Sequence, residues 1–292
     1  MNVCVKNSEK LRKRPLNTAI KFAVFSFFCV TIFSMTIFHS LILGIVEGLT
    51  EFLPVSSTGH LILAGKFLGL PDGNFEKSFD IIIQLGAILS VVVLYWRVFL
   101  RDLPALKKIC VAFLPTAVIG LALYKFIKQM LGSPWVVVWA LFLGGVILIV
   151  FEKLYKKKPQ TELVGNISEI SYKKAFLIGL FQSIAVIPGV SRSGATIVGG
   201  LSLGIKRETI VEFSFLLAVP TMCAATGLDL LKNWQSFSAS DAGVLAVGFA
   251  TSFIVALACI KLFLGFVRKY DFTSFGYYRI LVAIVAAFFL FK

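Results

Sequence analysis

The sequence has few charged residues for its length and no long polar segment. Of its 292 residues, 15% are charged, against about 25% in an ordinary soluble domain, while 58% are hydrophobic. None of the polar stretches is long enough to build a soluble domain with its own core. We therefore expect an all-α polytopic membrane protein.

The scarcity of histidine and the scatter of the cysteines argue against most metal and redox centres. Only His39 and His60 are present, too few for a multi-histidine metal site or haem chemistry. The five cysteines are scattered and mostly lie inside apolar runs, without the paired spacing of a zinc site or a disulfide framework. Any bound metal is therefore expected to have oxygen ligands.

The net charge of +14 does not indicate nucleic-acid binding, because the basic residues fall in the gaps between apolar segments. The segments 97–108, 152–174, 206–212 and 268–279 together hold 15 Lys and Arg, against five in the opposite gaps. By the positive-inside rule the first set is cytoplasmic. The run 156–158 is interpreted as part of this solvated cytoplasmic charge.

Seven apolar segments are predicted to cross the bilayer, which takes roughly 17–25 mostly apolar residues. They are 22–38, 79–96, 109–127, 135–151, 213–231, 244–266 and 277–291. The first follows a basic tail, and we interpret residues 1–38 as this tail and an extra N-terminal transmembrane helix. The alternatives are a cleaved signal peptide and a start of translation at Met35.

Two further apolar stretches, 41–53 and 175–188, are cut short by polar turns and are interpreted as re-entrant helix pairs. Aligning 56–59 with 191–194 places Glu47 opposite Gln182 and brings the following spans into register. We therefore predict one embedded domain, 39–292, built from repeats at about 40–151 and 175–292. Each repeat has one re-entrant pair and three transmembrane helices, so the second is inverted and the site lies between the broken helices.

Glu47 and Glu51 are four residues apart in an apolar helix, so their carboxylates share one face about 6 Å apart. Two such acids repel each other unless a cation or a shared proton intervenes. A divalent cation with hard oxygen ligands, Mg²⁺ or Ca²⁺, is predicted here. The alternative is that this end of the helix faces water and the two side chains are merely solvated.

The two polar turns have the composition of anion sites at helix N-termini. In the second turn Arg192 can clamp a phosphate with two parallel bonds, unless it snorkels to a lipid headgroup. The alternative for the first turn is plain helix capping by Ser57 or Thr58, and for His60 a buried structural role. The predicted substrate-binding residues are Ser56, Thr58, Gly59, Ser191, Ser193 and Gly194. Asp80, Gln84 and Asp229 are interpreted as polar residues of helix ends, and Tyr278 and Arg279 as interface anchors.

Four motifs carry a family resemblance: GIVEGLTEFLPVSSTGHLIL (44–63), FDIIIQLGAILSVV (79–92), PGVSRSGATIVGGL (188–201) and EFSFLLAVPTM (212–222). They resemble the bacterial undecaprenyl-diphosphatase family, the bacitracin-resistance phosphatases, from about residue 35 to the end. The resemblance implies removal of the terminal phosphate of undecaprenyl diphosphate, which recycles the carrier lipid for peptidoglycan. It implies a multi-pass protein of the bacterial plasma membrane. By position it places the functional residues of the family on Glu47, Glu51, Ser56, Ser57, His60 and Arg192.

We predict Ser57 as the nucleophile with His60 as its acid/base partner, and a metal-bound water as the alternative nucleophile. The active site is expected to open to the outer face of the membrane. The expected partners are undecaprenyl diphosphate and membrane lipid, and a homodimer is a further possible assembly. Inverted repeats with broken helices are also typical of transporters, so a lipid or anion transporter is the alternative function. A phosphatase of the phosphatidic-acid type needs a histidine after Arg192, and none follows position 60.

Overall fold

The computed structural model describes residues 35–71, 73–131, 133–156, 163–233 and 241–290. Apart from one isolated bridge between Val164 and Ile205, the regular structure of these residues is helical. Six helices are long and apolar enough to cross a membrane, which confirms six of the predicted spans. They are α5 (Asn74–Leu94), α7 (Leu103–Ala122), α9 (Pro134–Tyr155), α12 (Arg207–Asn233), α13 (Ala242–Val267) and α14 (Thr273–Leu290).

Residues 22–34 of the predicted span 22–38 lie outside the described part of the chain. The last two residues of this span begin the next helix, α3 (Ile37–Thr50). Thr36 caps this helix, and its side chain and backbone exchange hydrogen bonds with His39. His39 is therefore engaged in a capping box at the start of α3.

Two pairs of short helices replace continuous spans. The first pair is α3 and α4 (Ser57–Phe67); the second is α10 (Tyr172–Ser183) and α11 (Arg192–Ser202), separated by the short η2 (Ile184–Val186). These helices have 11 to 14 residues, fewer than the roughly 20 that cross a bilayer. The residue before each second helix, Ser56 or Ser191, has a positive φ, of 71° and 78°. A serine adopts this conformation only at the expense of strain, so both turns are fixed by their surroundings.

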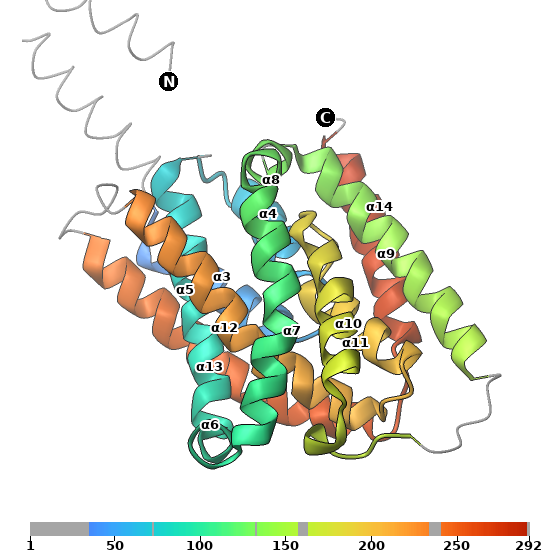
Figure 1. Ribbon diagram of the computed structural model, residues 1–292. Helices are drawn as coiled ribbons and strands as arrows, with labels where there is room; N and C mark the ends of the chain where they lie inside the picture. Colours follow the sequence, from blue (N-terminus) through green and yellow to red (C-terminus); the bar gives the residue numbers. More distant parts are fainter. Residues whose placement is uncertain (1–34, 72, 132, 157–162, 234–240, 291–292) are drawn as a thin grey trace, which may run out of the picture.

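Each pair of short helices packs against a helix from the other half of the chain. Gly44 and Gly48 let α3 approach the backbone of α13, and Gly179 lets α10 approach the backbone of α7. An added Cβ at Gly179 would lie 2.0 Å from the carbonyl oxygen of Ala112, so no larger residue fits there. In Figure 1, α10 and α11 lie between α7 and α9. The packing therefore places both helix breaks inside the bundle.

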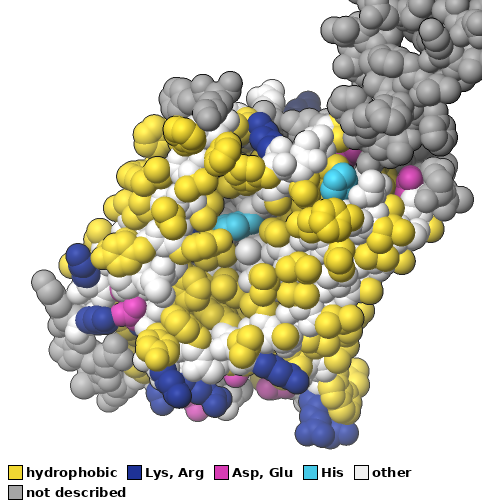
Figure 2. Space-filling model, turned by 180° about the vertical axis from the view of Figure 1, so that it is seen from behind, with side chains coloured by type: hydrophobic (Ala, Val, Ile, Leu, Met, Phe, Trp, Pro, Cys, Tyr) yellow, Lys and Arg dark blue, Asp and Glu magenta, His cyan; other side chains and the backbone are white. Residues whose placement is uncertain are grey.

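The minor helices connect these elements. The short helices α6 (Trp96–Arg101) and α8 (Tyr124–Leu131) precede and follow α7, and η1 (Ile167–Glu169) precedes α10. On the face shown in Figure 2, hydrophobic side chains form a wide band and most Lys and Arg side chains gather at one end. Such a band suits contact with lipid.

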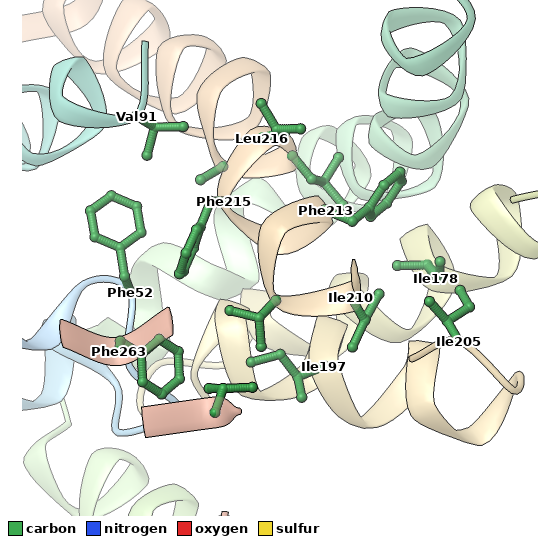
Figure 3. Packing of buried hydrophobic residues seen from close by; sticks show 14 of the residues in the cluster. Phe52, Val91, Ile178, Ile197, Ile205, Ile210, Phe213, Phe215, Leu216 and Phe263 are labelled. Carbon is green, nitrogen blue, oxygen red and sulfur yellow. The ribbon is translucent and has the colours of Figure 1, made fainter. Parts of the chain in front are cut away.

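The largest apolar core lies beside the two turns. Phe52 directly follows Glu51 and packs edge-on against Phe215 of α12, with ring centroids 5.2 Å apart. Phe213, Ile197 and Leu216 belong to the same buried cluster, part of which is drawn in Figure 3. Dense packing of this kind holds neighbouring polar groups in fixed positions.

Arg279 of α14 binds both turns at once. Its side chain is 1% exposed, and its guanidinium donates hydrogen bonds to five backbone carbonyls. The acceptors are Pro54 in the first turn, Gly189 and Val190 in the second, and Ala140 and Leu141 on α9. The interpretation of Arg279 as an interface anchor is therefore wrong. A charged residue near a basic loop is typical of such an anchor, and only the structure reveals the carbonyls around it.

We expect Arg279→Lys to destabilise the fold, because an ammonium has three donors where the guanidinium uses five bonds. At least two carbonyls lose their partner, at about 1–3 kcal/mol each, so the free energy of unfolding should fall by about 2–6 kcal/mol. The measurement is thermal unfolding of the purified protein in detergent. The matched control is Arg268→Lys, where the side chain is 65% exposed. Equal unfolding temperatures for Arg279→Lys and wild type would contradict the role of Arg279.

Candidate active site

Glu51 connects the two pairs of short helices. It is the C-cap residue of α3 and is buried between the two turns. Its Oε1 is 2.7 Å from a terminal nitrogen of Arg192, and its Oε2 accepts a hydrogen bond of 2.5 Å from Ser57. Three of the predicted site residues, which are up to 141 positions apart, are thus in direct contact.

Arg192 begins α11 and is held from two sides. One terminal nitrogen binds Glu51 and the other donates to the backbone carbonyl of Ser214 on α12, at 2.7 Å. The Nε atom is buried and has no acceptor in the described part of the chain. The side chain is 12% exposed, so the snorkelling alternative does not apply to Arg192.

Glu47 lies one turn before Glu51 and is fully buried. Neither of its carboxylate oxygens accepts a hydrogen bond from any donor among the described residues. A buried ionised carboxylate without a donor is unstable unless a cation or a proton accompanies it. The alternative of two solvated glutamates therefore does not describe this helix end.

The pair suits a divalent cation by the chemistry of its donors. Glu47 offers two oxygens without a partner, and magnesium sites commonly combine one or two carboxylates with the phosphates of the substrate. The described residues contain no group of three or more His, Cys, Asp and Glu side chains placed to hold an ion by themselves. A cation at this position would therefore depend on further oxygens from a ligand.

The hydroxyls of the second turn connect it to the first. Ser193 donates to the carbonyl of Leu53 at 2.7 Å and is 1% exposed. Ser191 accepts the backbone N–H of Gly194 at 3.1 Å and so caps α11. Within this turn Ser191, Ser193 and Gly194 therefore have structural partners. In the first turn, where capping by Ser57 or Thr58 was the alternative, α4 has no side-chain capping hydrogen bond.

His60 faces away from the large cavity of the site. Its Nδ1 is 2.8 Å from the carbonyl of Ser56, which can only accept, so Nδ1 carries a proton. Its Nε2 is 2.9 Å from the hydroxyl of Tyr278, whose ring stacks on the imidazole at an interplanar angle of 5°. Among the described contacts none joins His60 to Ser57, and His60 instead holds the Ser56 turn in its positive-φ conformation.

A cavity of about 1350 Å³ begins at the meeting point of the turns. Its polar end is formed by Glu51, Ser57 and Arg192, together with Ser56, Thr58 and Ser191. The predicted site residues Glu47, Gly59, His60, Ser193 and Gly194 are not among the described residues that line it. The rest of the wall is mostly apolar, although Lys66, Glu76, Lys77, Asp80 and Asp229 also line it. The polar end is therefore joined to a long, mainly apolar compartment.

The wall includes residues that the sequence interpretation placed elsewhere. Gln84 lies in the middle of α5 and lines the cavity with Asp80, so the assignment of Gln84 to a helix end is wrong. Asp229 also lines it and accepts a hydrogen bond of 3.4 Å from Ser78. Gln182, Thr116 and Thr221 meet at the edge of the cavity. The sequence interpretation did not single out the two threonines, although each directly follows a proline inside an apolar span.

Comparison with known proteins agrees with the four motifs. The profile of the family described as bacitracin resistance protein BacA matches residues 40–285. Proteins named undecaprenyl-diphosphatase from Aquifex aeolicus and Persephonella marina are 54% and 52% identical to the chain over 259 and 251 residues. These matches cover 88% and 86% of this chain and 100% and 98% of those proteins.

A protein of the same name from Campylobacter jejuni is 49% identical over 248 residues, which are 85% of this chain and 92% of that protein. The family profile includes both turns, all four motifs and each of the six long helices at least in part. The resemblance found in the sequence is therefore confirmed, and the chain belongs to the BacA family of bacitracin resistance proteins.

Proposed function

We propose that this protein is an undecaprenyl-diphosphatase, a membrane hydrolase that converts undecaprenyl diphosphate to undecaprenyl phosphate and inorganic phosphate. The name of its relatives, at about half identity over nearly their whole length, supports this activity. The reaction recycles the carrier lipid for peptidoglycan synthesis and so confers resistance to bacitracin. The observation that carries the proposal is the contact of Glu51 with both Ser57 and Arg192 at the polar end of a mainly apolar cavity.

The charge of the diphosphate would be met by Arg192 and by two helix N-termini. Helices α4 and α11 begin at Ser57 and Arg192, which both bind Glu51, so their first backbone N–H groups and positive dipole ends lie near the same place. Phosphoryl transfer depends largely on such positioning and charge stabilisation. The unsatisfied Nε of Arg192 is a further donor for a phosphate oxygen.

Ser57 is the proposed nucleophile, and the geometry favours Glu51 over His60 as its base. The Ser57 hydroxyl already donates to Glu51, whereas both ring nitrogens of His60 are engaged elsewhere. Oγ of Ser57 would bond to the terminal phosphorus while its proton passes to Glu51. The bond from that phosphorus to the bridging oxygen breaks, and undecaprenyl phosphate leaves. Water then hydrolyses the phosphoserine; direct attack by water on the diphosphate is the alternative.

Glu47 and Glu51 are the proposed ligands of a divalent cation, Mg²⁺ or Ca²⁺. When bound, the cation would neutralise the charge of the diphosphate and of the two carboxylates. The support is the position of Glu47, which is buried beside another acid and has no donor of its own within the described structure.

The fold is proposed to be an inverted repeat in the bacterial plasma membrane, with the extra N-terminal helix before it. Two observations support a repeat. The serines at the aligned positions 56 and 191 both have a positive φ. In each half the first short helix packs against a long helix of the other half, α3 against α13 and α10 against α7. The cavity is lined by Lys66 and Lys77, which lie in the gap assigned to the outside. The active site would thus open to the outer face, away from the 15 basic residues. A homodimer stays an open prediction.

The first prediction concerns the cation. Glu47→Gln removes the charge, keeps the shape and breaks no hydrogen bond, so the variant should fold as well as wild type. Phosphate release from undecaprenyl diphosphate should fall by about 100-fold, which corresponds to about 2.7 kcal/mol of barrier. The added stability that Mg²⁺ or Ca²⁺ gives wild type in thermal unfolding should also be lost.

The matched control for the cation is Gln182→Glu, which restores an acid at the aligned position of the second half. It should not create a second metal-dependent increase in stability, because a protonated carboxyl group can keep the hydrogen bonds to Thr116 and Thr221 without a cation. Wild-type turnover in excess chelator would contradict the cation proposal. Phosphate release in detergent, where no second compartment exists, also separates the hydrolase from a transporter.

The second prediction concerns Arg192. Arg192→Lys keeps the charge but cannot bind Glu51 and the Ser214 carbonyl through two separate nitrogens. Turnover should fall about thirty- to thousand-fold, equivalent to about 2–4 kcal/mol in the transition state, while apparent affinity changes less. Kinetics at saturating cation test this, with Arg207→Lys as an arginine control outside the site. Near-normal turnover would reduce Arg192 to a source of charge.

The third prediction concerns orientation. Single cysteines at the exposed positions Lys125 and Lys173, in a chain whose own cysteines are replaced by serine, should label differently in intact cells. A membrane-impermeant maleimide should reach position 125 and spare position 173 until the cells are opened. The reverse pattern would overturn the proposed access from the outer face.

A further inference from the structure

The large cavity extends well beyond the diphosphate site. Its volume of about 1350 Å³ exceeds the roughly 300–1000 Å³ typical of pockets for drug-sized ligands. Only its inner end carries Glu51, Ser57 and Arg192. From there the wall continues along the outer halves of α7 and α12, where most lining residues are small or apolar. A headgroup alone does not account for this compartment.

The helices α7 and α12 are tied together at one level by Gln182. Each helix contains a proline followed by a threonine, 115–116 and 220–221. The amide nitrogen of Gln182 donates to Thr116 at 2.9 Å and to Thr221 at 3.2 Å. On the inner side of this level the two helices share the buried core through Ile109, Ala112 and Phe213. Gln182 is therefore the inner limit of any gap between them.

On the outer side of that level the two helices separate and line the cavity, and Figure 1 shows them diverging towards α8. The facing residues include Ala117 and Leu121 of α7 and Ala224 of α12. A Cβ built at Gly120 or Gly227 would have no atom within 4 Å, so both positions border open space. Leu121 is 65% exposed. The two helix surfaces thus leave an opening between them.

A cation–π contact lies at the outer end of this opening. The Nζ of Lys232, at the end of α12, lies 3.6 Å from the ring centroid of Tyr124, the first residue of α8. Thr116 and Tyr124 are eight positions apart, so the opening is at most about 12 Å tall at 1.5 Å per residue. It is bounded by Gln182 inside, by Tyr124 and Lys232 outside, and by one helix on each side.

We propose that this opening is the lateral portal through which the polyprenyl chain of the substrate passes from the active site into the bilayer. The inference rests on the proposed function. A long prenyl chain cannot leave hydrocarbon, because each methylene exposed to water costs about 0.8 kcal/mol. The headgroup must nevertheless reach Arg192 inside the protein, so the chain needs an apolar path at membrane depth. The α7–α12 opening is continuous with the cavity, has small and apolar walls, and starts at the diphosphate end.

The test introduces large side chains into the portal. Gly120→Trp and Gly227→Trp place an indole in open space on either side of it, and Gly265→Trp on α13 is the matched control, at an equally open position outside the cavity wall. Phosphate release is measured for undecaprenyl diphosphate and for geranyl diphosphate, whose short chain fits inside the cavity. The portal variants should lose at least tenfold more kcat/KM on the long substrate than on the short one. The ratio for Gly265→Trp should match wild type.

Equal losses on both substrates, or no loss on either, would overturn the portal. If wild type released no phosphate from either substrate, the proposed function would fail, and the portal would still be tested by binding. For that purpose a prenyl monophosphate carrying a diazirine in its chain is photolysed with wild-type protein. Crosslinks to 116–124 and 221–232 support the portal. Crosslinks confined to the groove beside His60, lined by Leu63 and Phe67, would overturn it.

Discussion

The Glu51 carboxylate joins both broken helices, since one oxygen binds Ser57 at the start of α4 and the other binds Arg192 at the start of α11. Removing an ion pair from water gives little net stability unless the remaining donors and acceptors are also satisfied. Here Arg192 gains a second partner on α12 through the carbonyl of Ser214. A diphosphate that binds Arg192 in place of Glu51 would leave the Glu51 carboxylate available to accept the proton of Ser57. The same contact thus joins the two halves of the site and prepares its chemistry.

Irregular backbone inside a membrane protein needs partners for its polar groups, since lipid provides none. The two turns supply many of these partners to each other. Ser193 of the second turn donates to Leu53 of the first, and Arg279 donates to Pro54 and Gly189 from α14. These bonds offset the strain of two serines in a positive-φ conformation. The rigidity of the site is therefore a property of both halves together, and neither turn would keep its shape alone.

Hydropathy was sufficient to predict six spans, and the glycines, serines and prolines of the turns predicted where two helices break. Helix starts were less accurate. Asp102 caps α7 and Glu208 lies in the first turn of α12, so both helices begin six residues before the apolar runs that revealed them. The repeat alignment was sufficient to predict that Glu51 and Arg192 lie near each other, because it placed two helix starts at one site.

The partners of His60 and Arg279 were not predictable in the same way. Tyr278 is 218 positions from His60, and the Arg279 acceptors are backbone carbonyls, which no residue pattern reveals. Glu47 and Gln182, which the alignment pairs, show how the halves then diverged. Both are fully buried, but Glu47 has no donor among the described residues, whereas Gln182 binds two threonines and lies 3.4 Å from a third, Thr196. A buried neutral amide can hold three hydroxyls, whereas a buried carboxylate would need a counter-charge. One half therefore keeps a charge suited to a cation, and the other uses the equivalent position to fix the helices that border the cavity.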